Sequence, residues 1–218
     1  MNEYINTINK ASLFMNLSNE EITSFLSCAR KKIRQYKKGE VIFLAGNITD
    51  TIGIILEGTC HIIREDYWGN KTIINEIKKS GVIGEVFAIQ QIPLENTVTA
   101  RTDVTVMFLS IKTVLNPCSK SCSFHNEIIK NLIVILAKKT MVMNRKLEHI
   151  TKRSMKDKIL SYLSSMSEIK NSRTFEIPYN RTELSEFLCV DRAALSKELS
   201  RLQTEGIISY KKNEFTLN

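Results

Sequence analysis

The sequence predicts an α+β fold in which an N-terminal antiparallel β-roll (a double-stranded β-helix) is followed by a long helix and a C-terminal winged helix-turn-helix. Three observations predict it. Short β-branched runs separated by glycine turns fill residues 33–111, an apolar repeat of seven residues occupies 124–151, and two short amphipathic patterns joined by a tight turn lie at 180–204. We therefore expect three segments, 1–124, 125–151 and 152–218.

The composition is that of a globular protein. Of the 218 residues, 43% are apolar and 25% are charged. No window approaches twenty uninterrupted apolar residues, so we expect no membrane span. The N-terminus has neither the basic start nor the apolar run of a signal peptide. We therefore expect a cytoplasmic protein whose five cysteines remain thiols.

The first segment opens with a helix and then changes character. Ser18 and Glu21 form a capping-box pattern, and apolar residues recur at helical spacing from Ile22 to Ala29, which predicts a short helix ending near Arg30. Beyond it, β-branched runs alternate with turns, where glycine supplies a positive φ angle. The predicted strands are 41–44, 52–56, 60–63, 72–74, 97–100 and 104–109.

The second segment is a long amphipathic helix. Its apolar stripe repeats every seven residues over nearly four heptads, which at about 1.5 Å per residue gives roughly 40 Å of helix. The stripe consists of Ile129, Leu132, Leu136, Met143, Leu147 and Ile150. Such a helix is too long for one small domain, so we expect a two-fold seam between two copies of the chain. The alternative is a helix packed along its own β-roll.

The third segment contains the helix pair. Asn180 and Glu183 form a second capping-box pattern, and a turn at 189–191 separates this helix from one predicted over Arg192–Thr204. The buried stripe of the second helix is Leu195, Leu199 and Leu202. Helices joined in this way pack at a steep angle and leave the start of the second one protruding. Residues 206–217 then predict two strands with a basic tip, which is typical of a wing.

The protruding face of the second helix suits double-stranded DNA. Arg192 or Lys197 can donate to guanine O6 and N7 in the major groove. Asn180, Arg181 and Thr182, at the start of the first helix, are placed for phosphate contacts. The remaining predicted contacts are Asp191, Ala193, Ser196, Ser200 and Arg201.

A basic stretch precedes the helix pair in a chain of formal net charge +8. Its basic residues are Lys138, Lys139, Arg145, Lys146, Lys152, Arg153, Lys156 and Lys158, against Glu148 and Asp157. Cations beside a DNA-binding unit are the footprint expected for phosphate contacts. The alternative is a solvated helix face.

With these motifs the chain resembles the Crp/Fnr superfamily of bacterial regulators along nearly its whole length. The glycine pattern of residues 39–58, the Gly81–Glu85 loop and the stretch from Arg181 through Ser209 carry the resemblance. It implies an effector-controlled homodimer that binds a palindromic DNA site and recruits or blocks RNA polymerase. Two positions depart from the family. Ala193 replaces the usual acidic residue, and Cys189 stands where the turn usually has glycine. A non-glycine residue can be held in that turn at the cost of modest backbone strain.

The resemblance also implies an effector pocket. In members that bind cyclic nucleotides, a Gly-Glu pair meets the ribose and an Arg-Ser pair neutralises the phosphate. Here Gly84-Glu85 is present, but the arginine position falls near Leu94 or Glu95, and burying a phosphodiester without a cation is costly. We therefore expect an unknown small-molecule effector other than cyclic AMP. The alternative for Gly84-Glu85 is a turn glycine followed by a surface or backbone-bonding carboxylate. The expected pocket residues are Gly84, Glu85, Val86, Thr97, Val98, Thr99 and Asn144.

Three soft ligands stand just before the long helix. Cys118, Cys122 and His125 form a Cys-x3-Cys-x2-His pattern, which suits a zinc half-site, a haem ligand set or a thiol switch. An iron–sulfur cluster usually needs four cysteines, and only Cys28 precedes the β-roll. Ordinary small apolar side chains are the alternative, so we assign no metal.

No enzyme is expected. The three histidines, His61, His125 and His149, lie far apart, and no nucleophile elbow, phosphate-binding loop or His-Glu-x-x-His motif occurs. The remaining rival is an interaction module whose helix pair has lost DNA binding. Arg192 and Lys197 on one protruding face favour the DNA-binding interpretation.

Overall fold

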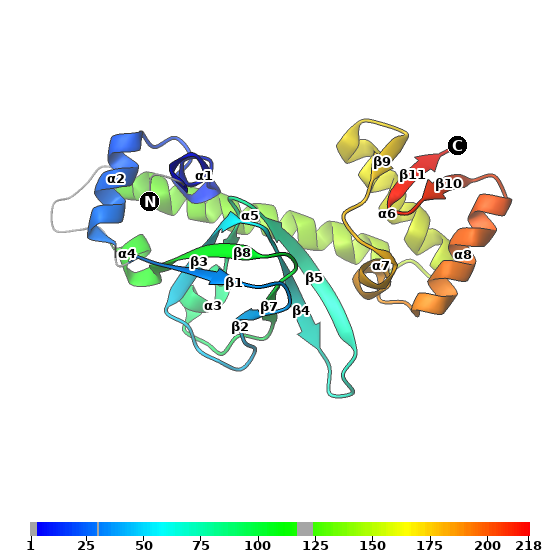
Figure 1. The fold of residues 1–218 in the computed structure, drawn as a ribbon, viewed down its shortest axis with the longest axis horizontal. Helices are drawn as coiled ribbons and strands as arrows, with labels where there is room; N and C mark the ends of the chain where they lie inside the picture. Colours follow the sequence, from blue (N-terminus) through cyan, green and yellow to red (C-terminus); the bar gives the residue numbers. More distant parts are fainter. Residues whose placement is uncertain (1–3, 30, 117–123) are drawn as a thin grey trace. The chain divides into compact units, whose positions relative to one another are not determined.

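The computed structural model describes residues 4–29, 31–116 and 124–218, and it divides into two compact units (Figure 1). The first unit holds Met1–Asn70 and Ile74–Thr140, and the second holds Lys71–Ile73 and Met141–Asn218. The division falls inside the long helix, so the segment expected at 125–151 is shared between the units, and it also falls inside the strand at 71–78, whose first three residues belong to the second unit. Among the described residues, no helix is long and apolar enough to cross a membrane.

The first unit is a β-roll of two antiparallel sheets. Its strands are β1 (Lys31–Tyr36), β2 (Val41–Phe43), β3 (Thr51–Glu57), β4 (Thr59–Glu65), β5 (Lys71–Lys78), β6 (Val82–Ile83), β7 (Thr97–Ala100) and β8 (Val104–Ser110). One sheet has the order β1-β8-β3-β6 and the other β2-β7-β4-β5. This confirms the predicted β-roll. The sequence pattern missed β1, because Lys31, Lys32 and Arg34 make it too polar to resemble a core strand.

Two apolar clusters hold the first unit together. Between the sheets, Phe43, Ile55, Val98 and Val106 are buried. On the outer face of the β1-β8-β3-β6 sheet, Ile54 and Met107 belong to a second cluster with the N-terminal helices and the long helix α5. The helices of this unit are α1 (Ile5–Asn9), a 3-10 turn (Ser12–Phe14), α2 (Asn19–Cys28), α3 (Glu85–Gln90), α4 (Ile111–Leu115) and α5 (Phe124–Ile150), which continues into the second unit.

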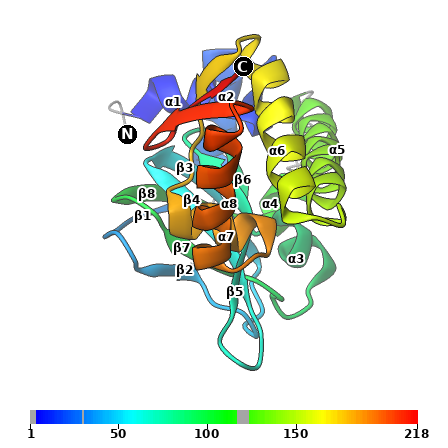
Figure 2. The same cartoon turned by 90° about the vertical axis from the view of Figure 1, so that its right-hand side faces the viewer.

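The second unit is a winged helix. It contains α6 (Met155–Lys170), β9 (Thr174–Glu176), α7 (Arg181–Leu188), α8 (Arg192–Thr204), β10 (Ile208–Lys211) and β11 (Glu214–Leu217). The strands form a sheet of order β10-β11-β9, and Figure 2 shows α7 and α8 side by side. Leu188, Leu195, Leu199 and Phe215 are among its fully buried core residues. Both predicted helices of the pair are confirmed, and α8 has the predicted bounds.

Candidate DNA interface and effector pocket

Side-chain caps fix where the two helices of the pair begin. At α7, Asn180 Oδ1 accepts from the Glu183 amide at 3.0 Å, and Glu183 Oε2 accepts from the Asn180 amide at 2.8 Å, which confirms the capping box. At α8, Asp191 Oδ1 accepts from the Ala194 amide at 2.7 Å. These bonds satisfy helix N-terminal donors that would otherwise lack partners. Asp191 is therefore the N-cap of α8 in the free protein.

The turn between the helices depends on a left-handed residue. Cys189 has φ 54° and ψ 54° and ends α7, as the sequence predicted for a non-glycine residue held with some strain. The following Val190 amide donates to Ser185 O at 3.0 Å. The chain therefore reverses within three residues, which brings α8 directly after α7.

The two faces of α8 have opposite character. Leu195, Leu199 and Leu202 are fully buried. The exposed face carries Arg192, Ala193, Ser196, Lys197, Ser200 and Arg201, together with neighbouring polar residues. Among the residues that the structure describes, neither Arg192 nor Lys197 forms an ion pair, whereas Arg201 pairs with Glu198 at 2.6 Å and Glu205 at 3.5 Å. Arg192 and Lys197 are thus the cations of this face that remain available.

Arg181 packs against the wing. Its guanidinium carbon lies 4.6 Å from the centre of the Tyr210 ring, and its Nη2 donates to Lys212 O at 3.0 Å. The sequence pattern did not show this contact, because the wing tip that supplies it lies 31 residues further along the chain. The phosphate contact expected for Arg181 stays a prediction. Thr182, its neighbour, is exposed.

The basic stretch is not one continuous phosphate-binding face. Lys139 bonds to Glu85, Lys146 is buried, and Lys156 pairs with Glu205 at 3.0 Å. Three of its cations therefore have partners inside the folded chain. A phosphate contact stays a prediction for the other cations of the stretch.

The Gly84-Glu85 loop carries a buried ion pair. Gly84 has φ 81°, and a Cβ there would lie 2.9 Å from the Phe43 ring, so only glycine fits. Glu85 is 1% exposed, and its Oε1 accepts from Lys139 Nζ on α5 at 2.6 Å, while its Oε2 has no hydrogen-bond partner among the described residues. Lys139 also donates to Val82 O at 2.8 Å. The alternative of a surface carboxylate is therefore wrong.

The sequence does carry a signal for the ion pair of Lys139. Lys139 continues the spacing of Ile128, Leu132 and Ile135, which are all buried in the core of the first unit. A lysine at the end of a buried helical stripe predicts an acidic partner, because a buried ammonium needs one.

The position that would hold a phosphate-binding arginine is occupied by other groups. Leu94 is buried between the sheets, and exposed Glu95 lies 3.5 Å from Arg64. Thr97 Oγ1 accepts from the Ala45 amide at 3.2 Å, and Val98 is a core residue. Thr99 is half-buried, Val86 is exposed, and Asn144 is exposed on the part of α5 that belongs to the second unit, so their place in a pocket stays a prediction.

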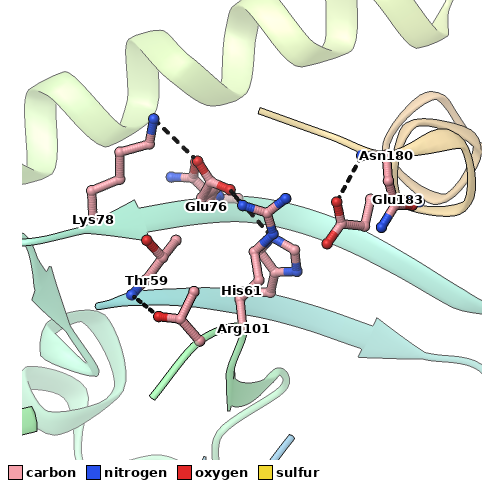
Figure 3. Close-up of polar contacts among 9 residues, drawn as sticks. Thr59, His61, Glu76, Lys78, Arg101, Asn180 and Glu183 are labelled. Carbon is pink, nitrogen blue, oxygen red and sulfur yellow. Dashed lines mark hydrogen bonds and ion pairs between the residues drawn. The ribbon is translucent and has the colours of Figure 1, made fainter. Parts of the chain in front are cut away.

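The nearest arginine in the sequence, Arg101, belongs to a different cluster. Its Nη1 lies 3.2 Å from Glu76 Oε2, which also lies 3.4 Å from His61 Nε2, while Lys78 Nζ lies 3.4 Å from Glu76 Oε1 (Figure 3). Burial would raise the pKa of Glu76, but the His61 hydrogen bond and the two cations outweigh it and lower that pKa. Sequence spacing gave no sign of this cluster, which the pairing of β4 with its neighbours assembles.

Two family models match the chain in succession. Residues 33–121 match the cyclic nucleotide-binding domain, and residues 157–218 match the Crp-like helix-turn-helix domain. The chain belongs to the Crp/Fnr family of transcription regulators. The order of the two domains, together with the long helix and the winged helix pair described above, confirms the resemblance that the sequence motifs indicated.

Solved structures of two bacterial regulators share the fold. The c-di-GMP-responsive global regulator CLP of Xanthomonas campestris superposes with a TM-score of 0.74 at 18% identity, over 92% of this chain and 99% of that one. A CRP/FNR-family transcriptional regulator of Thermus thermophilus gives a TM-score of 0.63 at 21% identity, over 86% and 93%.

Curated relatives match less than half of this chain. A potassium channel of Oryza sativa is 30% identical over 97 residues, which is 44% of this chain and 13% of the channel. A cAMP-dependent protein kinase regulatory subunit of Dictyostelium discoideum is 28% identical over 104 residues, 46% of this chain and 32% of the subunit. This regulator thus spans less than a third of each of these proteins.

The long helix of this Crp/Fnr-type regulator has two apolar faces. Leu132 is 3% exposed and lies in the core of the first unit, so its assignment to the seam is wrong. A different set of residues, Ile129, Ile133, Leu136, Met143, Leu147 and Ile150, is partly or largely exposed. Their spacing alternates between three and four residues when Thr140 is included, which is the a/d pattern of a coiled coil. The alternative of a helix packed along its own β-roll therefore holds for one face of α5, and a seam between two copies stays a prediction for the other face.

Of the soft-ligand motif, only His125 lies among the described residues; Cys118 and Cys122 lie outside them. His125 is buried against the rings of Phe25 and Phe124, with centroids 5.7 Å and 5.4 Å away. Its Nε2 lies 3.2 Å from Thr113 O. Within the described ranges, no group of three or more His, Cys, Asp or Glu side chains could hold a metal.

Proposed function

We propose that this chain is a homodimeric regulator that binds a palindromic DNA site and is controlled by a small-molecule effector. The observation that carries the proposal is the exposed face of α8, where Arg192 and Lys197 have no ion-pair partner among the described residues. A guanidinium on the first turn of a recognition helix reaches base edges, whereas buried leucines on the other face hold the helix in place.

The exposed apolar face of α5 supports the homodimer. Ile133, Met143 and Leu147 would be costly to leave in water over a helix of 27 residues, and a second copy presents the same stripe. Two recognition helices would then meet half-sites about one helical turn apart. Because its partners would be DNA and RNA polymerase, the chain would act in the cytoplasm and without catalysing a reaction.

The effector would be a molecule other than cyclic AMP. Leu94 and Glu95 supply no cation for a cyclic phosphate, Arg101 is held by Glu76, and Lys139 is held by Glu85. An unpaired phosphodiester in this loop would lose its hydration without compensation. The regulator from Xanthomonas campestris, which shares the fold, is described as c-di-GMP-responsive, so proteins of this fold can respond to a signal other than cyclic AMP.

A gel-shift titration of the full chain on its own promoter region, at two salt concentrations, tests DNA binding. We expect specific binding that weakens steeply as salt rises, because phosphate contacts release counterions. Arg192→Ala should reduce the preference for the specific site by about ten- to a hundredfold while leaving the dimer intact. Arg173→Gln, outside the proposed contacts, is the matched control.

The same assay distinguishes a DNA-binding regulator from an interaction module that has lost DNA binding. Absence of binding at low salt would indicate an interaction module, and unchanged site preference in Arg192→Ala would refute the assigned base contact. For the effector, calorimetric titration with cyclic AMP should show no tight binding. A micromolar dissociation constant would overturn our interpretation of the pocket.

A further inference from the structure

Arg181 joins the first helix of the pair to the wing. It is the first residue of α7, and its guanidinium lies over two aromatic rings of the wing, 4.6 Å from the centre of Tyr210 and 5.1 Å from that of Phe215. Its Nη2 also donates to Lys212 O at the wing tip, at 3.0 Å. The side chain is half-buried, and this burial lowers its pKa against an opposing contribution from Tyr210. The Arg181 guanidinium therefore contacts the wing through both rings and one backbone carbonyl.

The wing needs such an anchor. β10 pairs only with β11 in the order β10-β11-β9, so it is an edge strand, and Lys211–Glu214 is the last pair before the tip. Lys212 has φ 54°, a left-handed conformation that is unfavourable for lysine. The Tyr210 and Phe215 rings stack at 5.5 Å, and Arg181 packs against both. A short hairpin tip is only marginally stable by itself, so these contacts decide how firmly it is held.

We propose that Arg181 is a positioning residue that fixes the basic wing tip, Lys211 and Lys212, against the start of α7. The exposed ammonium groups of these lysines and the N-terminal end of α7 then face the DNA backbone at one fixed spacing. A cation that is held in place before binding loses less conformational entropy when it meets a phosphate. The inference rests on the proposed DNA binding and adds a residue whose role is to order the wing.

Hydrogen exchange on the free protein tests the anchor without DNA. In Arg181→Gln, the amides of β10 and β11 should exchange roughly tenfold faster, as expected when a hydrogen bond and a cation–π contact are lost. The amides of α8 should keep their protection, which shows that the unit remains folded. Arg181→Lys, which keeps the cation over Tyr210, should restore part of the protection, and Arg173→Gln should leave it unchanged. Equal wing exchange in Arg181→Gln and the parent would overturn the anchor.

A double-mutant cycle on DNA tests the consequence. In the parent, Lys212→Ala should reduce the slope of log affinity against log salt by about 0.9, the value for one phosphate contact. In the Arg181→Gln background the same change should reduce it by less than half as much, because the lysine is no longer positioned. If the effects of Lys212→Ala and Arg181→Gln on the salt slope were strictly additive, Arg181 would contact phosphate independently of the wing. That result would refute the positioning role.

The two experiments separate this inference from the proposed function. If the parent chain binds no DNA, the proposed function fails while the exchange result still decides whether Arg181 holds the wing. Binding by the parent with an additive cycle leaves the function intact and overturns the inference alone.

Discussion

At the scale of single residues, Lys146 shows what a buried cation does to stability. It is 4% exposed, it donates to the carbonyl of Ile73, and its Nζ lies 4.9 Å from the centre of the Phe187 ring. Burial lowers the pKa of its ammonium below 10.5, against an opposing attraction from Cys189. A base whose pKa is lower in the folded chain than in the unfolded chain holds fewer protons when folded, over the window between the two values.

The sign of the pH dependence follows. Between the lowered pKa of Lys146 and 10.5, the unfolded chain binds more protons, so raising the pH stabilises the folded parent. The variant Lys146→Met lacks this ammonium, so its unfolding free energy does not carry this pH dependence. We expect the unfolding free energy of the parent, relative to the variant, to increase in urea titrations as the pH rises through the lowered pKa toward 10.5. A difference that stays constant or moves the other way would contradict a depressed pKa.

The Lys139–Glu85 pair gives a second prediction at this scale. Lys139→Met leaves the carboxylate of Glu85 buried without its cation, and removal of one partner of such a pair destabilises by about 3 kcal/mol or more. Urea unfolding should show this loss. The double variant Glu85→Gln/Lys139→Met, which removes both charges, should recover a large part of it; equal losses in the single and double variants would argue against a charge effect.

At the scale of elements, the turn between α7 and α8 stores strain at Cys189. A non-glycine residue in the left-handed region costs about 1 kcal/mol, and the Cys189 side chain is exposed, so it buries little apolar surface that would offset this cost. We expect Cys189→Gly to stabilise the chain by up to about 1 kcal/mol, measured by thermal or urea unfolding. Cys28→Gly is unsuitable as a control because it lies in a helix; Cys28→Ser, exposed and outside the turn, should have little effect.

Elements whose causes are local were predictable from sequence. The capping residues Ser18, Asn180 and their partners set helix starts, and the leucine spacing of α8 set its buried face. The roles of Arg181, Lys139 and Glu76 were not predictable in the same way. Each depends on groups that tertiary packing or strand pairing brings together from distant parts of the sequence.

At the scale of the whole molecule, the exposed stripe of α5 predicts the oligomeric state. Met143→Asp/Leu147→Asp places charges in the proposed seam, where two copies would bring them together without compensation. Light scattering should show a fall from twice 25.0 kDa for the parent to 25.0 kDa for the variant. Lys138→Asp, on an exposed part of α5 outside the stripe, should stay dimeric; a parent that is already monomeric would refute the seam.

The division inside α5 also decides how the DNA-binding half can be studied alone. His149 Nδ1 lies 2.8 Å from Ser161 Oγ, its ring packs on Tyr162, and Lys146 lies over the ring of Phe187. A fragment that starts at residue 152, where sequence patterns placed the domain boundary, would lack both His149 and Lys146 and leave holes in its own interior. A C-terminal fragment should therefore begin near Met141 to retain the last turns of α5. It should still be less stable than the full chain, because it lacks Ile73, a core residue of the same unit whose carbonyl accepts from Lys146.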